Sequence, residues 1–97
     1  MTKIEVLALL HKHHAEIQRL FGVEHLALFG SVARDEMHAG SDVDVLIKFQ
    51  GPATFDGYMD LKFYLETLFK TQVDLVVDDD IKPRMRPMIE KDLIRVA

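Results

Sequence analysis

The sequence has no cysteine among its 97 residues. No disulfide can form, and a zinc site with cysteine ligands is excluded. A reducing compartment suits such a chain, so we expect a cytoplasmic location. Long hydrophobic runs are also missing, because residues 26–29 and 43–47 fall far short of the roughly 20 residues of a membrane span. The first residues carry charge and lack a small-residue cleavage site, so neither a signal peptide nor a membrane contact is expected.

Basic residues are scarce. The chain has 12 lysines and arginines against 16 acidic residues, a net charge of -4. Nucleic-acid binders usually carry a basic surplus, because neutralising phosphates supplies most of their affinity. We therefore expect no direct binding of nucleic acid. Only residues 82–97 reverse the balance, with five basic residues against two acidic ones. This segment is either a solvated surface or a patch that faces an anion or a partner.

The spacing of apolar residues predicts one domain over residues 1–97. Helices are predicted at residues 2–21, 55–69 and 83–91, with a helical turn or two at 32–37. Thr2 and Glu5 form a plausible capping box, and Gly22 is a natural stop for the first helix. Strands are predicted at residues 25–29, 42–49, 72–77 and 93–96. This order predicts an α+β (mixed α/β) fold, in which helices pack on a small mixed sheet.

Two acidic residues lie close together on the predicted strand 42–49. Asp42 and Asp44 are two positions apart, so they point to the same side with Cα atoms about 6.5–7 Å apart. Such carboxylates repel unless a cation lies between them, and Mg²⁺ prefers oxygen ligands of this kind. Two such ions form the clamp used for in-line attack at phosphorus. The alternative is structural: Asp42 opens the strand with an Asx-type turn, and Asp44 faces water.

A glycine and a serine follow the preceding predicted strand. Gly30 lets the backbone approach a phosphate closely, and Ser31 adds a hydroxyl donor next to the amides of a short helix. If the two strands pair, this anion site lies beside the aspartates. Asp74 is the best candidate for a third metal ligand, because it interrupts a buried strand where an unpaired charge is costly. Its alternative is a surface position on an edge strand.

A family resemblance appears in these segments. Gly30-Ser31, ten further residues and then Asp42-Val43-Asp44 resemble the signature of the DNA polymerase β-type nucleotidyltransferase superfamily. More narrowly, GSVAR, SDVDVLI and VDLV resemble the MntA antitoxins, minimal nucleotidyltransferases that are paired with HEPN-domain toxins. The resemblance covers residues 26–77 and implies a nucleotidyltransferase fold.

The resemblance also implies roles for the candidate residues. Asp42 and Asp44 would bind two Mg²⁺ ions, and Asp74 would bind the catalytic ion and help activate the acceptor hydroxyl. The triphosphate of ATP, the substrate, would be held by Gly30 and Ser31.

Arg34 matches a frequent arginine of the family and would steady the leaving pyrophosphate. It could instead form a salt bridge with Glu36 or Asp35. The family often has glycine after this arginine, where the chain has Asp35, so we expect the Asp35 side chain to face solvent.

The implied activity is protein adenylylation. The antitoxin would transfer AMP from ATP to a tyrosine of a cognate HEPN ribonuclease toxin, with which it would form a hetero-oligomer. Small size suits this activity, because little sequence remains to build an acceptor pocket and a partner can present its own hydroxyl. The alternative is a non-catalytic antitoxin that blocks the toxin by binding, although three retained acids favour the enzyme. Transfer to RNA or a small molecule is a third, less favoured interpretation.

Two other groups of residues are given structural roles. His11, His13 and His14 lack the carboxylate of a known metal motif, so we expect a solvated or half-buried helix face. Tyr58 and Tyr64 lie among apolar residues of the helix at 55–69. We expect both tyrosines to pack against the core rather than to accept AMP.

Overall fold

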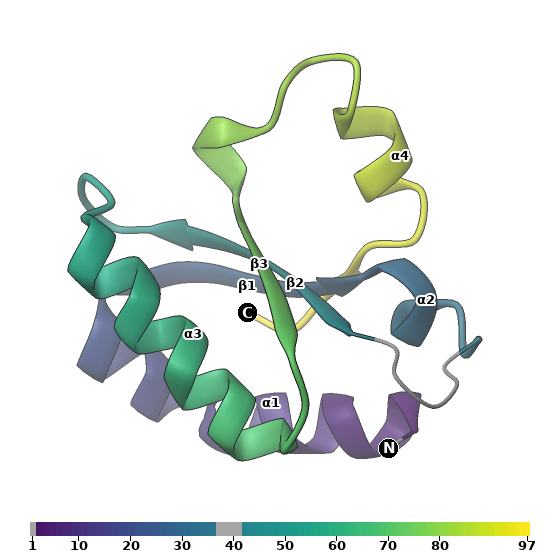
Figure 1. Cartoon of the computed structure of the whole chain (residues 1–97), viewed down its shortest axis with the longest axis horizontal. Coiled ribbons are helices and arrows are strands. Elements are labelled where there is room, and N and C mark those ends of the chain that lie inside the picture. The colour runs from purple at the N-terminus through teal and green to yellow at the C-terminus, as the bar shows by residue number, and fades with distance from the viewer. Residues whose placement is uncertain (1, 37–41) are drawn as a thin grey trace.

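The structure is a computed structural model that describes residues 2–36 and 42–97. Its elements follow in the order α1 (Lys3–Phe21), β1 (Val23–Phe29), α2 (Gly30–Ala33), β2 (Val43–Phe49), α3 (Phe55–Phe69), β3 (Val73–Val77), the 3₁₀ turn η1 (Asp78–Asp80), α4 (Arg86–Glu90) and β4 (Ile94–Arg95). In Figure 1, α1 and α3 lie side by side below the sheet, whereas η1 and α4 lie above it. The predicted mixed α+β fold is confirmed.

The four strands form one mixed sheet in the order β3-β2-β1-β4. β1 pairs antiparallel with β2 and with β4, whereas β2 and β3 are parallel. Parallel neighbours need a crossover connection, and α3 supplies it. This crossover places α3 against the same face of the sheet as α1 and leaves β3 at an edge.

Local sequence signals explain the ends of α1. The Thr2 hydroxyl accepts a hydrogen bond from the Glu5 amide at 3.2 Å, and the Glu5 carboxylate accepts one from the Thr2 amide at 3.2 Å. This reciprocal pair is the predicted capping box. Gly22 ends the helix with a left-handed φ of 65°, which glycine adopts without a steric penalty.

The hydrophobic core lies between the sheet and the two long helices. Every second residue of β2 is directed into it, namely Val43, Val45, Ile47 and Phe49. The facing helix residues are buried as well, among them Val6, Leu10, Ile17, Leu61 and Leu65. Strand side chains alternate between the two faces, so Asp44 and Lys48 are left on the face away from α1 and α3. We call this second face the open face.

Several boundaries differ from the sequence prediction. β1 begins at Val23, two residues early, and α2 begins at Gly30 instead of residue 32 and ends at Ala33. Helix α4 covers only Arg86–Glu90, because Pro87 lies in its first turn, where the missing amide proton costs no hydrogen bond. Met37 and the predicted loop at 38–41 lie outside the described residues. Within the described ranges, every helix is too short or too polar to cross a membrane.

Candidate active site

The turn after β1 lies directly against the first half of β2. The antiparallel register places Phe29 opposite Asp44, so Gly30 and Ser31 follow at the point where Asp44 emerges. Gly30 has a φ of 75°, and a Cβ at this position would overlap the Asp44 carboxylate. Only glycine satisfies both constraints. The backbone amide of Ser31 donates a hydrogen bond to Asp44, which fixes the carboxylate against the turn.

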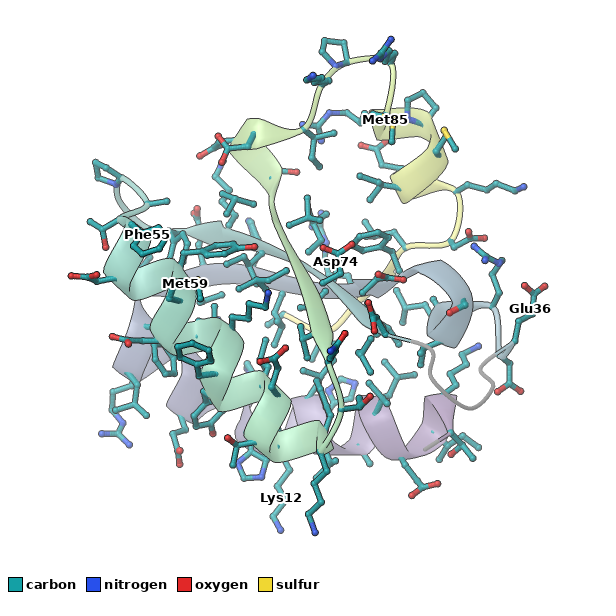
Figure 2. All side chains as sticks on the ribbon, viewed as in Figure 1. Lys12, Glu36, Phe55, Met59, Asp74 and Met85 are labelled. Carbon is teal, nitrogen blue, oxygen red and sulfur yellow. The ribbon has the colours of Figure 1, made fainter. Side chains whose placement is uncertain are left out.

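The parallel pairing of β2 and β3 brings two of the candidate acids together. Asp44 lies in register with Asp74, so the two residues are neighbours across strands that are about 4.8 Å apart. Asp44 is half-buried, whereas Asp74 and Asp42 are exposed. Asp42 precedes β2 directly. All three acids therefore lie around one edge of the open face, and Figure 2 shows the position of Asp74 on β3.

The electrostatics of this edge centre on Asp44. Its pKa is raised to about 6, first because burial removes water and then because the carboxylates of Asp74 and Asp42 repel its charge. Arg34 and the Ser31 amide oppose this rise but do not cancel it. The protein therefore holds a carboxylate where its negative charge is costly without a nearby cation.

The donor set suits magnesium. Mg²⁺ takes hard oxygen ligands and usually binds one or two carboxylates together with substrate phosphates. As the side chains stand in residues 2–36 and 42–97, no three acidic or imidazole groups are close enough to hold a metal ion. The mutual repulsion at Asp44 shows that the carboxylates are close enough to interact, and a divalent cation would relieve it. The residues present fit such an ion when side-chain rotation and phosphate oxygens complete its shell.

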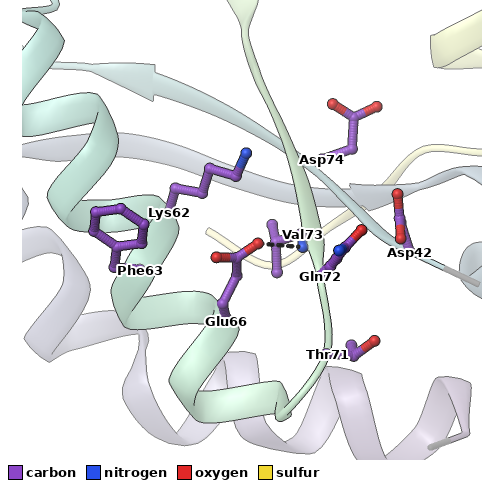
Figure 3. Close-up of a pocket in the computed structure, with 8 residues that line it drawn as sticks. All are labelled: Asp42, Lys62, Phe63, Glu66, Thr71, Gln72, Val73 and Asp74. Atoms are coloured by element: carbon purple, nitrogen blue, oxygen red, sulfur yellow. Dashed lines mark hydrogen bonds between the residues drawn. The ribbon is translucent and has the colours of Figure 1, made fainter. Parts of the chain in front are cut away.

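A groove of about 630 Å³ runs from α3 over the edge strand β3 to Asp42 and Asp74. Figure 3 shows its walls, with Lys62 and Glu66 on α3, Asp74 on β3 and Asp42 directly before β2. Two of the three candidate acids, Asp42 and Asp74, therefore line this groove. Lys62 and Glu66 were not identified from the sequence, because nothing in a helical pattern indicates which strand the helix will face.

Two side chains of α3 hold the outer edge of β3 on either side of Asp74. The Glu66 carboxylate accepts a hydrogen bond from the Val73 amide at 3.1 Å. The Tyr58 hydroxyl donates one to the Leu75 carbonyl oxygen. An edge strand otherwise exposes these groups, so α3 both satisfies them and fixes the backbone that carries Asp74.

Arg34 forms salt bridges in this structure. Its guanidinium contacts Glu36 at 2.9 Å and Asp92 at 2.8 Å. The sequence alternative named Glu36 correctly, but Asp92 lies 58 residues away and was missed. Asp35 is exposed, as expected, and has a φ of 59°. This left-handed conformation explains why glycine is frequent here in the family, and aspartate is among the residues that tolerate it.

The two tyrosines pack as expected. Tyr58 and Tyr64 both lie against the hydrophobic core. The Tyr64 hydroxyl also donates a hydrogen bond to Glu16 at 2.9 Å, which ties α3 to α1. Among the histidines, His13 makes an edge contact with the Tyr64 ring.

A mixed sheet backed by two helices, with a Gly-Ser turn next to a pair of neighbouring acids, is the arrangement that the sequence resemblance implied for a nucleotidyltransferase. A family model described as a nucleotidyltransferase domain matches residues 10–96, and the chain belongs to this family. The family resemblance seen in the sequence is thereby confirmed.

Within this family, the chain is similar to proteins of nearly the same length that are named protein adenylyltransferases. A Methanocaldococcus jannaschii protein with the provisional name protein adenylyltransferase MJ0126 is 35% identical over 96 residues, which cover 98% of each chain. The protein adenylyltransferase MntA of Thermococcus cleftensis is 31% identical over 96 residues, with 99% of this chain and 97% of the relative covered. The chain thus resembles minimal nucleotidyltransferases along nearly its whole length.

Solved structures agree with this grouping. A structure described provisionally as a minimal nucleotidyltransferase superposes with a TM-score of 0.81 and 31% identity, and 97% of this chain and 95% of that chain are covered. A tri-AMPylated HEPN toxin of Shewanella oneidensis in complex with its MNT antitoxin gives a TM-score of 0.69 and 15% identity, covering 94% and 71%. At that identity the second match shows the fold alone.

Proposed function

We propose that this protein is an antitoxin that transfers AMP from ATP to a tyrosine of a cognate HEPN ribonuclease toxin. The observation that carries the proposal is the register that sets Asp44 beside both Asp74 and the Gly30-Ser31 turn. The relatives named as protein adenylyltransferases and the AMPylated toxin in the Shewanella complex support a protein acceptor. The two proteins would act in the cytoplasm as a hetero-oligomer, and this chemistry requires no contact with nucleic acid.

The turn after β1 would hold the triphosphate. Gly30 has a positive φ and no side chain, so the backbone would be open where the phosphates approach. The Ser31 hydroxyl would donate a hydrogen bond to a phosphate oxygen. Arg34 would contact the leaving pyrophosphate after exchanging one of its two salt bridges for a phosphate. The Asp92 bridge is the more shielded of the two, because its carboxylate is 15% exposed against 62% for Glu36. We therefore expect the Glu36 contact to open.

The acidic edge would carry the chemistry. Asp42, Asp44 and Asp74 would hold two Mg²⁺ ions, which supply positive charge where negative charge develops on the phosphate oxygens. The tyrosine oxygen attacks the α-phosphorus in line, a new oxygen–phosphorus bond forms, and the bond to the pyrophosphate breaks. Asp74 lines the groove beside α3 and would take the phenol proton. The added AMP places bulk and negative charge on the toxin, which blocks its access to RNA.

The decisive experiment measures the mass of the toxin after incubation with this protein, ATP and magnesium. A gain of one or more AMP units is expected. The double variant Asp42→Asn/Asp44→Asn should lose at least about a thousandfold in transfer rate. Its matched control, Asp79→Asn/Asp80→Asn, removes two exposed aspartates from η1 and should transfer normally.

The main alternative is an antitoxin that masks the toxin without catalysis. It requires inhibition of the toxin at unchanged mass, and it requires the Asp42→Asn/Asp44→Asn variant to inhibit as well as the wild type does. Full transfer activity in that variant would instead end the role assigned to the acidic edge.

A further inference from the structure

A second cavity lies on the open face, between the sheet and α4. Its volume is about 270 Å³, just under the roughly 300 Å³ at which small-molecule sites usually begin. Its basic lining comes from four elements far apart in the sequence: His25 of β1, Lys48 of β2, Arg86 of α4 and Arg95 of β4. It shares no lining residue with the groove at Asp42 and Asp74.

Two of these cations have no carboxylate partner. Arg86 is compensated, because it contacts Asp78 at 3.1 Å and Glu90 at 3.5 Å. Lys48 and Arg95 form no salt bridge within residues 2–36 and 42–97. The cavity therefore keeps a positive surplus after its two carboxylates are counted, and an anion would be attracted to the Lys48–Arg95 side.

Apolar side chains line the cavity as well, namely Ala27, Leu46 and Leu93 among the residues on the open face. An apolar surface next to guanidinium groups suits an aromatic ring, because guanidinium planes stack on aromatic faces while their N–H groups bind phosphate. A base joined to a phosphate matches this combination better than a phosphate alone or an acidic peptide.

The cavity also lies on the reacting face. Asp44, Leu46 and Lys48 are alternate residues of β2 and so share one side of the sheet. Lys48 lies four residue steps along the strand from Asp44, a span of about 13 Å. Leu46 lies between them and lines the cavity, so a ligand in the cavity would lie along β2 next to the acidic edge.

We propose that this cavity is a binding subsite for an adenosine monophosphate unit, with its phosphate at Lys48 and Arg95 and its base over Leu46. The inference rests on the proposed function. The unit is an AMP already attached to the acceptor protein, because the α-phosphate of the donor ATP would lie at the acidic edge and not at Lys48. The subsite would hold the modified acceptor in place for another addition.

The first test is binding of free AMP without metal, followed by nuclear magnetic resonance of the isotope-labelled protein. Saturable shifts are expected at the amides of residues 46–48 and 93–95. The variant Lys48→Gln/Arg95→Gln should weaken binding roughly tenfold, and Glu90→Gln should tighten it about threefold, because it removes a carboxylate from the rim. The control Lys12→Gln/Arg19→Gln removes two exposed cations from α1, on the other side of the sheet, and should bind as the wild type does.

The second test measures transfer to the toxin. Lys48→Gln/Arg95→Gln should leave the KM for ATP unchanged and add fewer AMP units to each toxin. A raised KM for ATP with the number of AMP units unchanged would mean that the cavity contacts the donor, and would overturn the assignment to the modified acceptor.

Three results would overturn the subsite: AMP shifts confined to residues 30–34, equal AMP affinity in wild type and Lys48→Gln/Arg95→Gln, or a variant with both KM and AMP count unchanged. The Asp42→Asn/Asp44→Asn variant separates the subsite from the proposed function. It should still bind AMP through Lys48 and Arg95 even though it transfers none, so binding can succeed where catalysis fails.

Discussion

The two faces of the sheet are built from the same strands but differ in almost every physical property. Toward α1 and α3, β2 presents Val45 and Ile47, both fully buried. Toward the open face it presents Asp44 and Lys48, both partly exposed. On β3, Leu75 is buried whereas its neighbour Asp74 is exposed. The period of two in a strand thus places the buried core residues on one face and the residues of the proposed chemistry on the other.

The acidic residues on the open face lower the stability of the fold instead of adding to it. The helix face gains free energy from burial, whereas the open face keeps a carboxylate whose pKa is raised to about 6. Substitutions on the helix face should therefore lower the free energy of unfolding and affect transfer only through unfolding. Substitutions at the acidic edge should lower transfer and leave stability unchanged or higher.

Gly30→Ala should lower both stability and transfer, because Gly30 sets the backbone of the turn and lies directly against Asp44. The new Cβ would overlap the Asp44 carboxylate and force a left-handed φ on alanine. We expect a loss of about 3 kcal/mol in the free energy of unfolding, from the φ strain and the overlap together. Transfer should fall at least about a hundredfold, because the carboxylate is displaced from its position. Urea unfolding and toxin mass measure the two effects.

Gly51→Ala is the matched control. A Cβ at Gly51 meets no atom within 4 Å, so stability should change by less than about 0.5 kcal/mol and transfer should be normal. Equal effects of the two substitutions would mean that the contact between Gly30 and Asp44 does not matter.

A pair of valines on adjacent strands compares the faces directly. Val45 is fully buried toward the helices, whereas Val76 lies half-buried on the open face. Val45→Ala should cost about 2–3 kcal/mol in unfolding free energy, from lost burial and the cavity left behind. Val76→Ala should cost less than about 1 kcal/mol. Denaturant unfolding of both variants tests the comparison, which fails if Val76→Ala costs as much as Val45→Ala.

The sequence predicted most of the helix face and the main elements of the acidic edge. The capping box at Thr2 and Glu5, the limits of α3 and the alternation in β2 are local patterns, and each matches the structure. The sequence predicted that the Gly30-Ser31 turn would lie beside Asp44 if the two strands paired, and the register of β1 and β2 supplies this pairing.

Contacts between distant segments could not be predicted. Asp92 reaches Arg34 from 58 residues away, and Glu66 and Tyr58 reach the outer edge of β3 from a helix. The cavity under α4 joins residues of β1, β2, β4 and α4. Each depends on crossing angles and side-chain directions that are set only when the elements pack, so no spacing in the sequence records them.

Asp44→Asn should reveal the cost of the acidic edge. The pKa of Asp44 is raised from 3.8 to about 6 in the folded protein. The folded state therefore binds the proton more tightly than the unfolded chain, and this contribution to stability is complete below about pH 4 and lost as pH rises through about 6. Without metal, Asp44→Asn should therefore have a higher free energy of unfolding than wild type at neutral pH. This stability advantage should grow by about 1 kcal/mol between pH 4 and pH 6, since solvent still screens the partly exposed group.

Unfolding in urea at pH 4.5 and pH 7.5 measures this advantage. Magnesium chloride provides the control, because a cation at the acidic edge stabilises the wild type and not the variant. At pH 7.5 the advantage should shrink or reverse when magnesium is added. An advantage that is independent of both pH and magnesium would contradict the account of Asp44.

The smallest expected effect concerns the support that α3 gives to Asp74. Glu66→Ala removes the acceptor for the Val73 amide at the outer edge of β3 and should cost about 1 kcal/mol in unfolding free energy. Because Val73 adjoins Asp74, kcat should fall roughly fivefold while the KM for ATP stays unchanged, as expected of a positioning residue. Glu66→Gln keeps an oxygen that can accept the bond and should restore kcat. If Glu66→Gln were as slow as Glu66→Ala, or if KM rose instead, the carboxylate would act through its charge, and the hydrogen bond to β3 would not be what holds Asp74 in place.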